Sequence, residues 1–374
     1  MAGIGWEFGK VFNWDGVGTS SSDYADVTLE AQSPGGTSFT LFNSSAYYLY
    51  LGHSQKFDMA IFDVDTAGSL GALTWEYRKS DDTWVEFVPA SGRFATDSDD
   101  NEGVPYAFDK TGAETFPSNL LDDWATLTIN SANLYWIRVT AASVATAPTI
   151  KRIQCRPFAI YTTSKLVYEL LQLKNVLNGT DFTSSTVPSK ETVDFFINES
   201  QSYIDMNTRK SWRPNLIYDE HHQFNLNGIK LEMPDAQRVL QLKIWTGSTW
   251  ELKAQGRQAD YFLVPETGMV HFARYFLLPA RLSSFGATQF GGGEFTHPVK
   301  ITYLSGRDIN TDITQAGIIQ EACKKMVAID VMRNADFGNA VVSGMDRVSM
   351  ESRIQSWQTE IEDRLDFLTA FEVF

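Results

Sequence analysis

The chain has 374 residues, of which 43% are hydrophobic and 21% are charged, a composition typical of packed globular proteins and unlike that of disordered or fibrous chains. Because domains cluster around roughly 100–200 residues, this length indicates two domains. The formal net charge of -15 argues against a surface built to bind nucleic acid phosphates, which needs concentrated positive charge.

Apolar runs in the sequence are all shorter than the roughly 18 residues that a membrane-spanning helix needs. The first seven residues, MAGIGWE, also lack the basic start and apolar stretch of a signal peptide. We therefore expect a soluble protein that is made in the cytoplasm and has no membrane partner. Cys155 and Cys323 lie far apart without metal-ligand spacing, so we expect both to be small buried apolar residues.

Residues 1–158 read as an all-β domain. Aromatic and β-branched residues alternate with polar ones in short segments between Ser-, Thr- and Gly-rich turns, and a helical period is missing. The predicted strands cover residues 39–42, 46–51, 57–64, 73–77, 83–87, 124–129, 134–140 and 149–154. About eight antiparallel strands favour a jelly-roll-like β-sandwich, which would serve as a decoration or binding domain.

Residues 159–374 read as a mainly helical domain with a β-rich insertion. Leu166, Leu170, Leu173 and Leu177 recur at three- and four-residue intervals after a Thr/Ser cap, which predicts a helix over about 163–177. Similar periodicity predicts helices over about 189–209, 312–335 and 348–370. Between them, residues 216–305 return to a strand pattern, so we expect a β insertion there.

Sequence motifs of catalysis are missing. We find no nucleophile with a base, no metal-ligand cluster and no glycine-rich phosphate loop at a strand-to-helix junction, so we expect no enzyme, no catalytic residue and no cofactor. A weak alternative is calcium bound by Asp97, Asp99 and Asn101 in an acidic loop. Because the glycine of that loop falls one place late and no closing Glu follows, a solvated loop is the main interpretation.

Two further segments are candidate contact sites. Arg209, Lys210 and Arg213 form the densest basic cluster, which either is a solvated helix end or contacts an acidic neighbouring subunit. The tail of the chain carries Phe371 and, after Glu372, Val373 and Phe374. These apolar side chains either pack on the protein's own core or dock into another subunit.

Three stretches of the second half carry a resemblance to a known family. They are residues 203–209 (YIDMNTR) at the end of the second predicted helix, residues 260–272 (DYFLVPETGMVHF), and residues 299–306 (VKITYLSG) leading into the helix over 313–333. In order and spacing they resemble the head–tail connector family, also called adaptor or head-completion proteins, of tailed phages and archaeal tailed viruses. The resemblance covers a little over half of the chain.

The resemblance implies a virion protein of the neck that assembles in the host cytoplasm as a twelve-subunit ring. It implies contacts with the portal protein, with Phe371, Val373 and Phe374 as docking candidates, and with a tail or tail-completion protein on the opposite face. Viral DNA would pass through the ring during packaging and ejection without sequence-specific binding. Arg209, Lys210 and Arg213 are then candidate contacts between subunits.

The first half resembles β-sandwiches that are appended to phage virion proteins. Residues 73–77, 84–87, 124–129 and 135–139, which are rich in Trp and Tyr, carry this likeness. Such domains decorate particles or bind glycans or fibres. The alternatives to a neck connector are therefore a glycan-binding virion module and a structural protein of the baseplate or tail tip.

Overall fold

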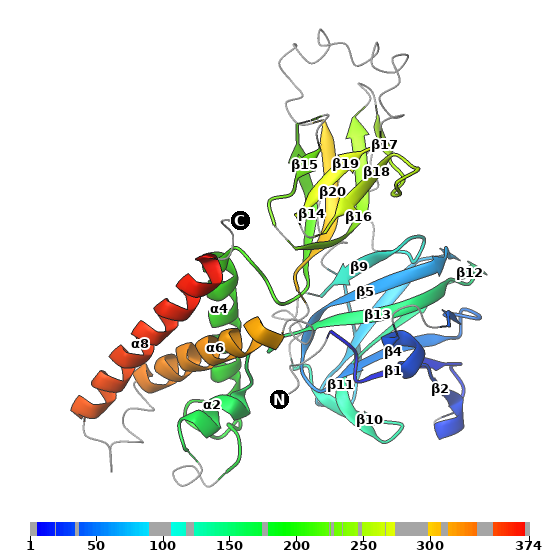
Figure 1. Cartoon of the computed structure of the whole chain (residues 1–374). Coiled ribbons are helices and arrows are strands. Elements are labelled where there is room, and N and C mark those ends of the chain that lie inside the picture. Colours follow the sequence, from blue (N-terminus) through cyan, green and yellow to red (C-terminus); the bar gives the residue numbers. More distant parts are fainter. Residues whose placement is uncertain are drawn as a thin grey trace.

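The chain forms three regions in the computed structural model: a β-sandwich, a group of helices and a second β region (Figure 1). The structure describes residues 6–18, 20–33, 37–89, 106–116, 123–173, 179–223, 225, 228–233, 235–245, 249–265, 267–273, 298–307, 313–334 and 347–370. Several antiparallel sheets give a β-rich architecture, and the described helices are concentrated in the second half of the chain.

The first sheet of the sandwich has the strand order β2-β1-β4-β11-β7-β8, with β10 pairing alongside β11. Every pairing in it is antiparallel. Its strands are β1 (Lys10–Trp14), β2 (Tyr24–Asp26), β4 (Tyr48–His53), β7 (Leu73–Arg78), β8 (Trp84–Phe87), β10 (Thr126–Ile129) and β11 (Ala132–Ala141).

The second sheet has the order β3-β13-β5-β9. Its strands are β3 (Phe39–Thr40), β5 (Phe57–Thr66), β9 (Gly112–Thr115) and β13 (Thr149–Pro157). A small separate pair joins β6 (Ser69–Leu70) and β12 (Val144–Thr146), and the short helices η1 (Ser21–Asp23) and α1 (Thr28–Gln32) precede β3.

The two sheets bury one shared core. On β11, Ile137 and Val139 point into it, and on β5, Phe57 and Phe62 meet them from the other sheet. Successive side chains of a strand point to opposite faces, so the alternating pattern of the sequence fixes which residues enter this core. The expected β-rich first half is therefore found, with two antiparallel sheets around one core.

All eight predicted strands of the first half correspond to observed ones, with ends shifted by a few residues. Several short elements were missed: strands β1, β2, β6, β9 and β12 and the short helices η1 and α1. Strand β1 lies before the region that the alternation marked, and α1 is a helix of five residues in a stretch where we expected none. Such a short helix holds fewer than two turns, so no periodicity can reveal it.

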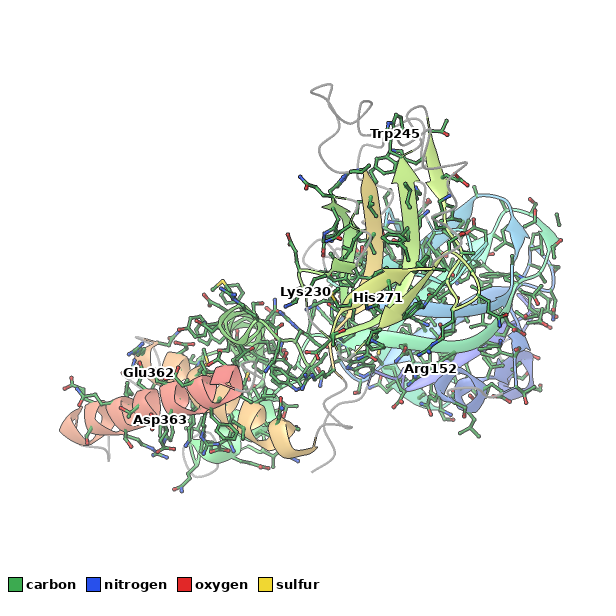
Figure 2. The ribbon with its side chains drawn as sticks, turned by 45° about the horizontal axis from the view of Figure 1, so that its top comes forward. Arg152, Lys230, Trp245, His271, Glu362 and Asp363 are labelled. Carbon is green, nitrogen blue, oxygen red and sulfur yellow. The ribbon has the colours of Figure 1, made fainter. Side chains whose placement is uncertain are left out.

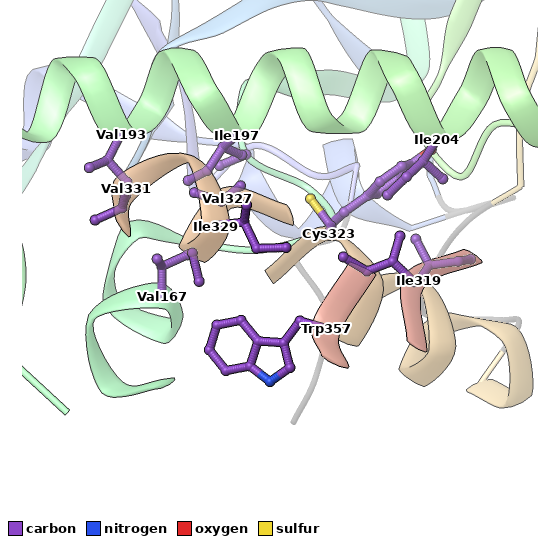
Figure 3. Close-up of a cluster of buried hydrophobic side chains, with 14 of the residues drawn as sticks. Val167, Val193, Ile197, Ile204, Ile319, Cys323, Val327, Ile329, Val331 and Trp357 are labelled. Carbon is purple, nitrogen blue, oxygen red and sulfur yellow. The ribbon is translucent and has the colours of Figure 1, made fainter. Parts of the chain in front are cut away.

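Four helices of the second half share a second core (Figure 3). They are α2 (Ser164–Leu170), α4 (Lys190–Thr208), α6 (Ile313–Arg333) and α8 (Arg347–Ala370). Helix α6 contacts each of the other three, and Ile319, Cys323 and Val327 on it are fully buried. The three longer helices begin and end within about two residues of the predicted ranges.

The first predicted helix is too long in our sequence prediction, because α2 ends at Leu170. Gln172 adopts a left-handed conformation with φ of 56°, and the N–H of Leu173 donates to the carbonyl of Tyr168 at 3.3 Å. This is a Schellman motif, which stops a helix and usually has glycine at the left-handed position. Because Gln172 occupies that place, no helix stop signal is visible in the sequence before Gly179.

The β insertion between α4 and α6 has its own core between two sheets. One sheet has the order β14-β20-β16-β17, formed by β14 (Asn215–His222), β20 (Val299–Ser305), β16 (Ala236–Trp245) and β17 (Trp250–Leu252). The other has the order β15-β19-β18, formed by β15 (Ile229–Lys230), β19 (Met269–Phe272) and β18 (Tyr261–Val264). The predicted range of 216–305 agrees with these limits.

The insertion packs on the outer face of the second sandwich sheet. Met59 and Ile61 of β5 point away from the sandwich core and form a small apolar cluster with Leu304 of β20. Arg156 of β13 donates to Asp58 at 2.6 and 2.9 Å and to Asn215 of β14 at 3.1 Å. Strand β5 is therefore covered on both faces, which explains its continuous apolar run, residues 59–62.

Cys155 lies in the sandwich core and Cys323 in the helical core, both as free thiols, as the sequence predicted. Burial raises the pKa of each thiol above its ordinary value. Among the described helices, none is both long and apolar enough to cross a lipid bilayer.

Candidate functional site

The basic cluster at the end of α4 mainly makes contacts within its own chain. Lys210 is only 4% exposed, and its Nζ donates to the carbonyl of Leu368 in α8 at 3.0 Å. The Nε of Arg213 donates to Asp205 at 2.7 Å. Arg209 adopts a left-handed conformation that turns the chain back against the helices, and it is exposed.

These positions correct the sequence interpretation of the cluster. We expected a solvated helix end or a contact with a neighbouring subunit. Instead, Lys210 ties α4 to α8, and Arg213 forms an ion pair with a residue of its own chain. Of the three cations, Arg209 is the one that the structure leaves on the surface as a candidate contact.

Around Asp205 the structure builds a buried polar cluster, which we call the Asp205 cluster (Tyr161, Asp205, Ser211 and Arg213). The carboxylate accepts hydrogen bonds from Tyr161 Oη, from Ser211 Oγ at 3.2 Å and from Arg213. Burial raises the pKa of Asp205, while Arg213 and the hydroxyl donors oppose that shift. The cluster joins the segment that leaves the sandwich to the end of α4.

Gln201 fastens the same segment one turn earlier in α4. Its Oε1 accepts from the N–H groups of Ile160 and Tyr161 at 2.7 and 2.9 Å, and its Nε2 donates to the carbonyl of Phe158 at 2.6 Å. The connection between the two halves is therefore hydrogen-bonded along several residues. Sequence reasoning placed the boundary here but gave no sign that buried side chains of α4 hold it.

Helix α4 presents apolar side chains to the surface as well as to the core. Phe195, Tyr203 and Met206 are 64%, 47% and 72% exposed. With 3.6 residues per turn, positions 195, 199, 202, 203 and 206 fall on one side of the helix, opposite the buried Val193 and Ile197. We call Phe195, Tyr203 and Met206 the α4 outer stripe; sequence analysis missed it because it used only the core stripe of this helix.

The outward side of α8 is acidic. Ile354, Trp357, Ile361, Leu365 and Leu368 face the helical core, as their spacing predicted. Exposed carboxylates occupy the other side, and Figure 2 shows two of them, Glu362 and Asp363, on this helix. The exposed acidic residues of α8 are Glu351, Glu362, Asp363 and Asp366.

Two groups of predicted site residues lie outside the described residues. They are the weak calcium candidates Asp97, Asp99 and Asn101, and the portal-docking candidates Phe371, Val373 and Phe374. Within the described ranges, no group of three or more His, Cys, Asp or Glu side chains is arranged to hold a metal ion.

No protein-family model and no curated protein matches the chain. Several solved chains are similar to it, including two from gene transfer agent particles. One is a chain in the virion of a native gene transfer agent particle, with 11% identity, and the other is a chain in the neck of an empty gene transfer agent particle computed with C6 symmetry, with 12% identity. Each similarity covers 52% of this chain and 91% of the other, with a TM-score of 0.28. Because this score is low, the function proposed below rests on the chain's own residues.

Proposed function

We propose that this chain is a structural virion protein of the neck, whose helical module forms a ring that joins the portal to the tail and lets DNA pass. The observation that carries the proposal is the order of elements in the second half. The three stretches that resemble the head–tail connector family fall at the end of α4, on β18 and β19, and on β20 before α6. Helices before and after the insertion then pack into one core.

In this proposal the α4 outer stripe is a contact between neighbouring subunits. Large apolar side chains exposed together on one helix face mark an interaction site when they are not part of the protein's own core. A ring forms through head-to-tail contacts in which one surface of each subunit meets a different surface of the next. Phe195 and Met206, the most exposed members of the stripe, supply apolar area for such a contact.

The acidic side of α8 would line the channel. Carboxylates there repel DNA phosphates, so that DNA slides through without binding to bases. The proposed protein has no catalytic role and needs no cofactor. Its partners are copies of itself, the portal protein, a protein of the virion tail and the DNA in transit. Phe371, Val373 and Phe374, near the last residue of the chain, remain candidates for portal docking.

The first test is negative-stain electron microscopy of the full chain, alone and mixed with the portal protein. We expect closed rings that cap the portal, and twelve subunits is the number that the family resemblance implies. Rings that do not bind the portal would favour the baseplate or tail-tip alternative. A protein that stays monomeric with and without the portal would contradict the proposal.

The α4 outer stripe is tested by the double variant F195S/M206S. Because both side chains are exposed, we expect the variant to fold with an unchanged melting temperature but to sediment as a monomer where the unmodified chain sediments as a ring. The matched control is Leu29→Ser, which removes an equally exposed apolar side chain (77%) from the sandwich. Rings of normal size from the double variant would exclude this stripe as the contact.

A further inference from the structure

The outward face of the first sandwich sheet carries aromatic residues instead of the usual polar ones. Tyr24, Trp14 and Tyr48 are direct cross-strand partners on β2, β1 and β4. One step along the strands, Tyr50 on β4 is opposite Arg138 on β11. Because Ile137 and Val139 of β11 point into the sandwich core, Arg138 and its partners point outward.

We call Trp14, Tyr24, Tyr48, Trp84, Arg138 and Glu76 the aromatic platform. All six side chains are half-buried, so each presents part of its surface to solvent. The rings of Trp14 and Tyr24 are stacked with centroids 5.9 Å apart, and those of Trp14 and Tyr48 are 5.4 Å apart. The guanidinium of Arg138 lies 4.7 Å from the ring of Tyr48 and 4.3 Å from that of Trp84. The platform therefore extends from β2 to β8.

A cluster of buried aromatic side chains supports the platform. Trp136, Phe12 and Tyr50 form a small buried cluster on the same face of the sheet, and the rings of the platform pack against it. The Nε1 of Trp136 donates to the carbonyl of Leu127 at 2.8 Å, which fixes the indole. Gly52 makes room for that ring, because a Cβ at this position would lie 2.4 Å from it. A face that is ordered before binding loses little conformational entropy when a ligand arrives.

The charges of the platform are paired within the chain. Arg138 donates to the two carboxylate oxygens of Glu76 at 2.7 and 3.0 Å. At the edges, Lys10 pairs with Asp26 at 2.6 Å, and Arg78 pairs with Asp82 at 3.0 Å. Each of these cations thus has a carboxylate partner on the same face. An anionic ligand would meet no excess of positive charge here, and the chain as a whole has a net charge of -15.

These paired charges favour a neutral ligand that offers both apolar and polar groups. A pyranose sugar has a flat C–H face, which can lie on an aromatic ring, and hydroxyl groups around its edge. Three of the five N–H groups of Arg138 take part in bonds to Glu76 and Tyr50, which leaves two to donate to a hydroxyl. The carboxylate of Glu76 can accept from a hydroxyl at the same place.

A protein partner fits the same face less well. Tyr, Trp and Arg are common at the centre of protein–protein interfaces, but carboxylates are depleted there. The ion pair with Arg138 places the carboxylate of Glu76 in the middle of this platform, where Arg138 lies against Tyr48 and Trp84. Placing an apolar protein surface there would remove water from both charges without supplying hydrogen bonds. Sugar hydroxyls, by contrast, would form hydrogen bonds with these charges in place of the hydrogen bonds to water that are lost on binding.

We propose that the aromatic platform of the sandwich binds a neutral glycan made of pyranose units. This activity is separate from the ring contacts of the helical module. In the assembled particle the sandwich would bind a neutral polysaccharide, while the helical module forms the ring.

The test is affinity electrophoresis of the full chain through native gels that contain a soluble neutral polysaccharide: a β-glucan, a mannan, a galactomannan or a starch-type glucan. We expect retardation by at least one of them. Trp84→Ala and Trp14→Ala should each raise the apparent Kd at least tenfold at an unchanged melting temperature, whereas Trp84→Tyr, which keeps an aromatic ring, should bind nearly as well as the unmodified chain.

The matched control is Trp250→Ala, which removes a half-buried tryptophan from β17 of the insertion and should leave retardation unchanged. Migration that none of the four polysaccharides slows would overturn the proposal, and so would equal retardation of Trp84→Ala and the unmodified chain. If Trp84→Ala instead abolishes self-association seen by sedimentation and no polysaccharide slows the protein, the platform is a protein contact. Ring formation with the portal is scored separately, so failure of one proposal leaves the other intact.

Discussion

Asp205 stabilises the connection between the sandwich and the helices, because its carboxylate accepts hydrogen bonds from three side chains. Asp205→Ala would leave the buried guanidinium of Arg213 and the hydroxyl of Tyr161 without this partner. Removing one member of a buried ion pair costs about 3–5 kcal/mol. We expect that loss in the free energy of unfolding, measured by urea denaturation.

The control for this change is Glu199→Gln, which alters an exposed carboxylate of the same helix and should shift the free energy of unfolding by less than about 0.5 kcal/mol. Equal stability of Asp205→Ala and the unmodified chain would show that the Asp205 cluster contributes nothing to the joint.

Asp194 on α4 gives a residue-scale prediction about pH. Burial raises the pKa of Asp194 from 3.8 to about 6, with Lys190 and Lys56 opposing the shift. Between about pH 4 and pH 6 the folded state therefore binds more protons at this site than the unfolded chain does. Stability at this site must fall as pH rises through that window.

Asp194→Asn removes this titration, so the variant should be more stable than the unmodified chain above pH 6, by up to ~3 kcal/mol for a shift of about two units. Thermal melts from pH 4 to pH 8 measure the difference between the two proteins. A difference that does not grow between pH 4 and pH 6 would disprove the assignment.

At the scale of elements, α8 has an apolar face that packs in the helical core and an acidic face that is exposed. Its apolar stripe packs on α6 and α4, while Glu362, Asp363 and Asp366 face away from the core. If this side lines a channel, the triple variant E362K/D363K/D366K should fold normally, because the three side chains are exposed. Its positive charges would hold phosphates and slow DNA release.

The measurement is the rate of DNA ejection from particles assembled with this variant. We expect slower ejection at low salt and partial recovery at high salt, since screening weakens the contacts. The control is K165E/E169K on α2, which exchanges two charges without changing the net charge. Ejection at the normal rate from the triple variant would place the acidic side of α8 outside the channel.

The elements also show where sequence patterns were sufficient. The ends of α4 could be predicted because Ser189 caps one end, where its Oγ accepts from the N–H of Thr192 at 3.3 Å, and Pro214 follows the other. The end of α2 could not, because Gln172 occupies a left-handed position at which glycine is the usual signal. Strand alternation located the sandwich strands but did not reveal which outward faces are covered.

At the scale of the whole molecule, the insertion is held on the sandwich by a few polar residues around a small apolar cluster. Arg156 bridges the two regions through Asp58 and Asn215, and Arg238 of β16 pairs with Asp63 of β5. Arg156→Ala should lower the free energy of unfolding by about 1–3 kcal/mol, because Asp58 and Asn215 lose their charged partner. The insertion should also become more sensitive to protease.

Limited proteolysis with mass spectrometry measures this effect, and the control is Arg152→Ala on the same strand, whose bond to Glu7 is longer, at 3.5 Å. We expect new cuts within residues 215–305 for Arg156→Ala and the normal pattern for the control. The same pattern from both variants would mean that the apolar cluster alone holds the two regions together.

By itself the sequence determined the β-rich first half, the four helices, the β insertion and the burial of both cysteines, because each depends on local periodicity, on caps or on composition. Only the tertiary structure decided how residues far apart in the chain are used. It turned Lys210 and Arg213 inward against Leu368 and Asp205, and it brought Tyr24, Trp14, Tyr48, Arg138 and Trp84 onto one sheet face. Strand order and helix packing set these neighbours, and a local pattern carries no record of which strands become adjacent.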